Sequence, residues 1–140
     1  MKILNVSYIL QDNEVIIGQA LAFDKTIVKI APLEELLQNY PDAEVIDTPP
    51  YSLLMPGLIN AHVHLEFSAN KTQLKYGKFM PWLHSVIENR EELINNCSLE
   101  CMQKGTESML RCGITSFGAI SSHAMDLEAA EKAKQNVVFF

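Results

Sequence analysis

The order of segments after Tyr51 constrains the fold of this chain more than any other feature of its sequence. "SLLMPGLINAHVHLEF", residues 52–67, is apolar through its first half, which predicts a strand buried on both faces. The segments that follow are predicted to be two helices, a strand, a helix and a last strand, at residues 79–95, 98–111, 114–120, 126–136 and 137–140. This alternation is typical of a parallel sheet with crossover helices, so we expect an α/β fold.

The second predicted helix carries its own boundary signals. Ser98 is a suitable N-cap, and Gly113 fits the position just after the last turn. The helix before it contains Pro81, which is acceptable because it falls in the first turn.

Residues 1–50 have a different pattern from the rest of the chain. Short apolar stretches such as "KILNVSYIL", "EVIIGQALAF" and "TIVKIA" alternate with polar turns. They predict a small antiparallel sheet, with one short helix over "PLEELLQNYP". We therefore divide the chain into a domain of residues 1–50 and a domain of residues 51–140.

The charge and the cysteines of the chain exclude several classes of partner and of site. The formal net charge is −6 and no cluster of Lys or Arg occurs, so we expect no nucleic-acid partner and no anionic-membrane partner. The N-terminal residues turn polar too soon for a signal peptide or a membrane span, and a cytoplasmic protein is expected. Cys97 and Cys101 can share a helical face, but no histidine lies beside them, which favours reduced thiols over a metal pair.

The predicted parallel sheet is too small to close on itself. Three parallel strands cannot form a barrel, and an edge at "VVFF" would be apolar and unpaired. A complete barrel of alternating strands and helices needs about 250 residues. We expect these residues to be the front portion of a larger protein, with the remainder or another copy covering the exposed surface, and we expect a homo-oligomer.

Two histidines near the end of the first predicted strand are the best candidates for chemistry. Side chains alternate along a strand, so His62, His64, Glu66 and Ser68 are expected to point the same way. Two imidazoles on one face can converge on one divalent ion. A His-x-His pair is a weak motif by itself, because histidines bonded to main-chain carbonyls, or a surface pair, produce the same pattern. Its position at the carboxyl end of a buried strand, where parallel-sheet enzymes hold their chemistry, favours a metal site.

The segment "LLMPGLINAHVHLEFS" resembles the first barrel strand of the amidohydrolase superfamily of metal-dependent hydrolases. The following "NKTQLKYGKFMPWLHSVIENREEL" resembles the deaminase and chlorohydrolase branch of that superfamily. "HVHLEFSANK", "YGKFMPWL" and "GAISSHAMD" are together most similar to the aminofutalosine deaminases. The resemblance implies that residues 51–140 are the first strands and helices of an incomplete (β/α)8 TIM-like barrel, and that residues 1–50 are the N-terminal part of a small β-sandwich domain.

The resemblance also implies roles for individual residues. His62 and His64 would be ligands of one divalent metal ion, with zinc favoured and iron open. Glu91 and Trp82 match positions that contact a nucleoside, and Glu66 could contact substrate or support the site. Ordinary structural roles stay open for these three side chains. The proton-shuttling residues of the family are expected further along, so no catalytic residue is assigned among these positions and the segment alone is expected to be inactive.

The reaction that this resemblance implies is hydrolytic deamination of an aminopurine nucleoside. The favoured substrate is 6-amino-6-deoxyfutalosine, which would yield futalosine and ammonia in menaquinone biosynthesis. Deamination of adenosine, S-adenosylhomocysteine or guanine, and triazine hydrolysis, stay open within the same family. A non-catalytic truncated module that binds a metal or a partner is the alternative from another class.

Overall fold

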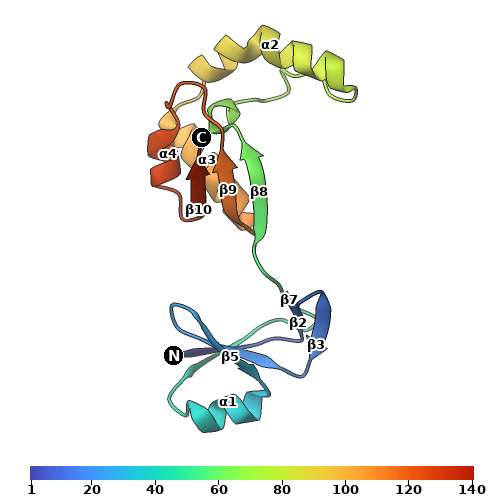
Figure 1. The fold of residues 1–140 in the computed structure, drawn as a ribbon, viewed down its shortest axis with the longest axis vertical. Coiled ribbons are helices and arrows are strands. Elements are labelled where there is room, and N and C mark those ends of the chain that lie inside the picture. Colours follow the sequence, from blue (N-terminus) through green and yellow to red (C-terminus); the bar gives the residue numbers. More distant parts are fainter. The chain divides into compact units, whose positions relative to one another are not determined.

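The computed structural model describes residues 1–140, and its contacts divide the chain into two compact units, Met1–Pro56 and Gly57–Phe140. Each unit has its own sheets (Figure 1). Each unit also has its own cluster of buried side chains. No helix in either unit has the length and the apolar character that a membrane crossing requires.

The N-terminal unit contains two small sheets and one short helix. One sheet has the strand order β5-β4-β1-β6 and the other has the order β3-β2-β7. The elements are β1 (Lys2–Asn5), β2 (Tyr8–Gln11), β3 (Glu14–Ile17), β4 (Ala20–Phe23), β5 (Ile27–Ala31), α1 (Leu33–Asn39), β6 (Glu44–Asp47) and β7 (Leu53–Leu54). The expectation of an antiparallel sheet is wrong for two pairs, because β6 pairs in parallel with β1 and β7 pairs in parallel with β2. The chain passes through α1 before β6, and this crossover lets it return beside β1 in the same direction.

One expected strand of this unit is broken for a local backbone reason. "EVIIGQALAF" divides at Gly18, whose φ of +73° is a left-handed conformation that glycine adopts freely. The two halves become β3 and β4, which belong to different sheets. The core beside the four-stranded sheet consists of fully or nearly fully buried side chains from Ile3, Ala20, Ala22, Ala31 and Leu36.

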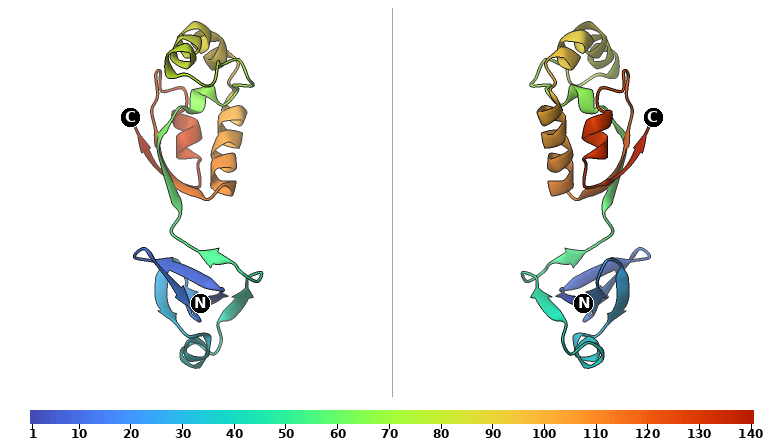
Figure 2. Two further views of the ribbon diagram at one scale, coloured as in Figure 1. Left: turned by 90° about the vertical axis from the view of Figure 1, so that its right-hand side faces the viewer. Right: turned by 90° about the vertical axis from the view of Figure 1, so that its left-hand side faces the viewer.

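The C-terminal unit is built on a parallel sheet with the strand order β10-β9-β8. Its elements are β8 (Leu58–Val63), the 3₁₀ turn η1 (Leu65–Phe67), α2 (Phe79–Asn95), α3 (Leu99–Arg111), β9 (Ile114–Ala119), α4 (Leu127–Glu131) and β10 (Asn136–Phe139). Figure 2 shows α3 and α4 on one face of the sheet, and Figure 1 shows α2 beyond the carboxyl ends of the strands. The prediction of a mixed α/β fold with parallel strands is confirmed.

The core of this unit lies between the sheet and the two helices that cover it. Phe117 from β9, Met102 from α3 and Ala129 from α4 are almost completely inaccessible to solvent. Leu65, in the turn after β8, joins the same cluster. The end of β8 is therefore anchored by packing, which limits how far the residues around it can move.

Two predictions about this unit are wrong in detail. The first strand is not buried on both faces, since Leu58 is 48% and Ile59 is 75% exposed. The reason is that α3 and α4 pack on one face of the sheet only. The helix expected over residues 126–136 is shorter, because α4 ends at Glu131 and the chain then turns into β10.

The boundary signals of α3 are confirmed. The Ser98 hydroxyl accepts a hydrogen bond of 3.2 Å from the Cys101 backbone N–H, which is the N-cap interaction. Gly113, just after the helix, has a φ of +83° and lets the chain turn directly into β9.

Candidate metal centre

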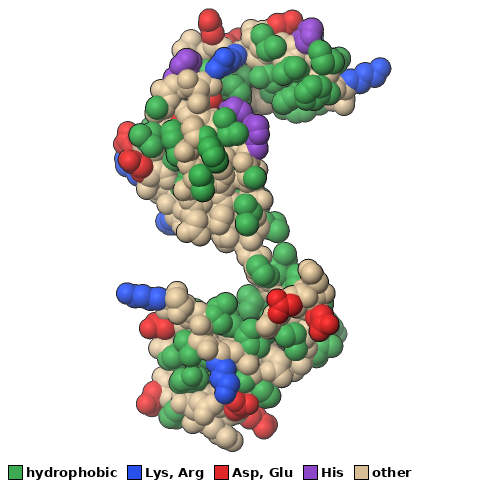
Figure 3. All heavy atoms as spheres, viewed as in Figure 1, with side chains coloured by type: hydrophobic (Ala, Val, Ile, Leu, Met, Phe, Trp, Pro, Cys, Tyr) green, Lys and Arg blue, Asp and Glu red, His purple; other side chains and the backbone are tan.

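The candidate ligand pair lies where β8 ends. The Nε2 atoms of His62 and His64 are 3.1 Å apart, and their ring centroids are 5.1 Å apart with the planes tilted by 56°. The His64 ring also stacks on Phe67, with centroids 5.3 Å apart. Figure 3 shows histidine side chains at the surface beside this end of β8. The two rings therefore present the same nitrogen atom to one point at the edge of the unit.

The pairing of β8 with β9 is irregular between Asn60 and Val63, the stretch that contains His62. Asn60 pairs with Phe117 of β9, and Val63 pairs with Ala119. Between these two pairs β8 therefore contains one residue more than β9. This extra residue is a β-bulge, which interrupts strict alternation of side chains. Ala61 is accordingly exposed, while Val63 and Leu65 pack in the core.

Gly118 of β9 makes room for the bulge. A Cβ atom placed on Gly118 would lie 2.6 Å from the Ala61 carbonyl oxygen, closer than real Cβ contacts occur. The main chain of β8 therefore approaches β9 at a distance that only glycine allows. This residue was not identified from the sequence, because its importance depends on pairing with a strand far away in the chain.

Glu66 lies next to the histidine pair, although not as part of a strand. Its Oε1 atom is 3.3 Å from the Nδ1 atom of His64 and accepts a hydrogen bond of 3.3 Å from the Ser122 hydroxyl. The strand ends at Val63, and the turn η1 brings the Glu66 carboxylate back to His64. Ser122 was not predicted as a site residue, and its only sequence signal is its place in the loop after β9.

The donor atoms suit a divalent cation in type and in spacing. Zinc binds imidazole nitrogens at about 2.0–2.1 Å, so two nitrogens 3.1 Å apart can both contact one ion. No group of three or more His, Cys, Asp or Glu side chains in the structure is arranged to hold a metal ion. Because catalytic zinc sites use three protein ligands and an open position, the pair supplies part of a ligand set.

The other predicted site residues are not in contact with the histidines. Trp82 is half-buried near the start of α2, with its ring 5.8 Å from that of Phe79. Glu91 is exposed further along α2, about 14 Å from Trp82 along the axis at 1.5 Å per residue. At 100° per residue these two side chains leave α2 on opposite sides, so they cannot contact one small group together.

The family model described as "Amidohydrolase family" matches residues 53–140, which include the whole parallel sheet and the histidine pair. The chain belongs to the amidohydrolase family. Over all 140 residues it is 44% identical to a protein from a Nitratiruptor species named aminodeoxyfutalosine deaminase, of which it covers 34%.

Solved structures give the same result for the fold. Aminofutalosine deaminase from Helicobacter pylori, crystallised in complex with methylthio-coformycin, matches 100% of this chain with a TM-score of 0.87 and 33% identity. An adenosine deaminase from Xanthomonas campestris with bound zinc matches 87% of the chain with a TM-score of 0.68 and 25% identity. The chain covers 35% and 29% of these two proteins. It therefore spans about a third of the length of the relatives it matches.

Proposed function

We propose that the protein is a metal-dependent aminohydrolase that deaminates an aminopurine nucleoside, with 6-amino-6-deoxyfutalosine as substrate and futalosine and ammonia as products. The observation that carries the proposal is the 3.1 Å contact between the Nε2 atoms of His62 and His64 at the carboxyl end of β8. Similarity over the whole chain to a protein named aminodeoxyfutalosine deaminase supports the choice of substrate. Menaquinone biosynthesis would be the pathway that uses this reaction.

In this proposal, His62 and His64 bind one divalent metal ion, with zinc favoured by the zinc-bound relative and iron as the alternative. When bound, such an ion would lower the pKa of a water molecule and so supply the nucleophile for hydrolysis at the amino-bearing carbon of the purine. The two imidazoles hold the ion at the edge of the unit, and packing of Leu65 in the core keeps the end of β8 in place. Glu91 of α2 would contact the nucleoside through its carboxylate, and Trp82, on the opposite side of the same helix, would then have a packing role. The Glu66 carboxylate lies 3.3 Å from Nδ1 of His64.

The proposed function also implies a fold for the complete protein. Residues 51–140 would be the first strands and helices of a (β/α)8 barrel, and residues 1–50 part of a small β-sandwich domain. On the sheet face that carries no helix, Ile59, Val138 and Phe140 are between 59% and 75% exposed. Exposed apolar faces of this kind typically pack against other protein. The cover would be the remainder of the protein or a second copy in a homo-oligomer. The three free cysteines support a cytoplasmic location.

The test is ammonia release by the polypeptide translated from the complete reading frame. We expect turnover of 6-amino-6-deoxyfutalosine, loss of activity in His62→Ala and in His64→Ala, and no activity from residues 1–140 alone. His84→Ala is the matched control, because His84 is exposed on α2 and has no hydrogen bond or ion pair. Turnover of adenosine or guanine without turnover of 6-amino-6-deoxyfutalosine would overturn the proposed substrate. Full activity in His62→Ala would overturn the proposed site.

A further inference from the structure

A carboxylate is buried immediately behind the histidine pair. Glu66 is 1% exposed, and its Oε2 atom has no hydrogen-bond partner. Burial of a carboxylate lowers the stability of the folded protein unless other groups bind it, and an apolar side chain of similar size would avoid this cost. A buried glutamate at this position therefore indicates a role for the carboxylate. The two groups that do bind it are His64 and Ser122, both through Oε1.

The contact with Glu66 favours one of the two positions for the hydrogen on the His64 ring. A neutral imidazole has a hydrogen on one nitrogen and a lone pair on the other. An ionised carboxylate accepts hydrogen bonds only, so Oε1 at 3.3 Å from Nδ1 favours the hydrogen on Nδ1. The lone pair is then on Nε2, which is the atom 3.1 Å from His62.

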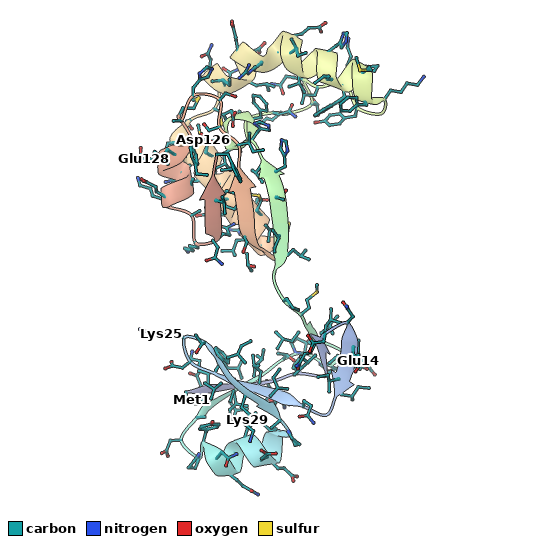
Figure 4. All side chains as sticks on the ribbon, viewed as in Figure 1. Met1, Glu14, Lys25, Lys29, Asp126 and Glu128 are labelled. Carbon is teal, nitrogen blue, oxygen red and sulfur yellow. The ribbon has the colours of Figure 1, made fainter.

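The second bond to Glu66 fixes the carboxylate itself. The Ser122 hydroxyl donates to Oε1 from the loop that follows β9. That loop is held by Ser121, whose hydroxyl donates to the buried carboxylate of Asp126 and accepts from the Ala124 N–H at 2.9 Å. Figure 4 labels Asp126 at the start of α4. The loop after β9 is therefore linked to His64 through Glu66.

His62 has no equivalent support. The His62 ring lies within hydrogen-bond distance of one group, the Nε2 atom of His64. Its main-chain N–H donates to the side chain of Asn60, which leaves the orientation of the imidazole free. The pair is thus asymmetric, because His64 contacts both His62 and a buried carboxylate, whereas the His62 ring contacts only His64.

We propose that Glu66 is a positioning residue that holds His64 in the tautomer with its Nε2 lone pair available for the metal ion, and that Ser122 keeps Glu66 in place. The metal-binding part of this inference rests on the proposed function, while the tautomer of His64 does not. Carboxylates that bind the second nitrogen of a ligand histidine typically raise metal affinity by 10- to 100-fold.

The tautomer is measured without any metal. Nitrogen-15 chemical shifts of the imidazoles in the metal-free protein, at a pH where they are neutral, report which nitrogen carries the hydrogen. We expect His64 to be held with the hydrogen on Nδ1 in the wild type and to become a mixture of tautomers in Glu66→Leu. The exposed Glu88 supplies the control, and Glu88→Gln should leave the spectrum of His64 unchanged. A mixture of tautomers at His64 in the wild type would overturn the inference.

The metal-binding part is measured by zinc titration of the polypeptide from the complete reading frame, in competition with a chelator. We expect Glu66→Leu to weaken zinc binding roughly 10- to 100-fold, and Glu66→Gln, which keeps an acceptor oxygen, to weaken it less. Ser122→Ala should weaken it while leaving the carboxylate intact, and it gives a second variant if Glu66→Leu does not fold. Equal zinc affinity in the wild type, Glu66→Leu and Ser122→Ala would overturn the inference. Equal zinc affinity in the wild type and in His62→Ala would instead overturn the proposed metal site. In that case the metal-free nitrogen-15 spectra would still show which tautomer His64 adopts in the wild type.

Discussion

Gly118→Ala should destabilise the protein by disturbing the bulge that carries His62. The added Cβ would lie 2.6 Å from the Ala61 carbonyl oxygen, about 0.8 Å short of ordinary contact at 3.4 Å. The obstacle is main chain, so it cannot rotate away, and β8 must move. Overpacking of this kind costs about 1–3 kcal/mol. Replacement of a strand glycine by alanine returns about 0.5–1 kcal/mol, because glycine loses more backbone entropy on folding.

The net loss in the free energy of unfolding is therefore expected to be about 1 kcal/mol, within a range of about 0–2.5 kcal/mol. It is measured from urea denaturation curves of the wild type and the variant. Because Ala61 adjoins His62, the shift should also change the distance between the two Nε2 atoms and weaken zinc binding in the same variant.

Gly105→Ala is the matched control for this prediction. Its added Cβ would also have one close neighbour, the Ser68 Oγ atom at 2.7 Å, but that atom is the end of a side chain that can rotate. Alanine is favoured over glycine within a helix by about 1 kcal/mol, so this change in α3 should be neutral or stabilising. An increase in stability for Gly118→Ala, with unchanged zinc affinity, would refute the role assigned to the bulge.

Two further predictions concern α3 and the residues around it. Ser98→Ala removes the acceptor of the Cys101 N–H and should lower the free energy of unfolding by about 1 kcal/mol in urea denaturation, whereas Ser108→Ala, at an exposed position within the helix, should change it less. Burial raises the pKa of the Cys97 thiol above its ordinary value, so the reactive thiolate forms at higher pH than in an unburied cysteine. In the folded protein, mass spectrometry should find that iodoacetamide modifies the exposed Cys112 before Cys97, and that modification of Cys97 increases as the pH is raised. Equal modification of both thiols near neutral pH would contradict this.

The main features of the C-terminal unit could be predicted because they depend on local pattern. Apolar strands and amphipathic helices alternate in the sequence, and the parallel sheet follows from that order. Ser98 and Gly113 act as boundary residues because capping depends only on the backbone next to them. The convergence of His62 and His64 could be proposed for the same reason, since they are two residues apart at the end of one strand.

The parts that could not be predicted depend on residues far apart in the chain. Strict alternation predicts that Ala61 shares a covered face with Val63, but the register between β8 and β9 inserts a bulge between them. Strand alternation predicts that Glu66 shares a face with His64, but Glu66 lies in the turn η1, which brings its carboxylate to His64. Ser122 reaches Glu66 only because β9 pairs beside β8, which no local pattern indicates. Gly18 likewise divides an apolar stretch that looked like one strand.

The most direct test of the account is a crystal structure of the zinc-loaded protein with anomalous diffraction data at the zinc edge. We expect an anomalous peak about 2.0–2.1 Å from the Nε2 atoms of both His62 and His64, with Glu66 still beside Nδ1 of His64. A map in which the two rings point apart, or bind main-chain oxygens with no ion between them, would contradict it.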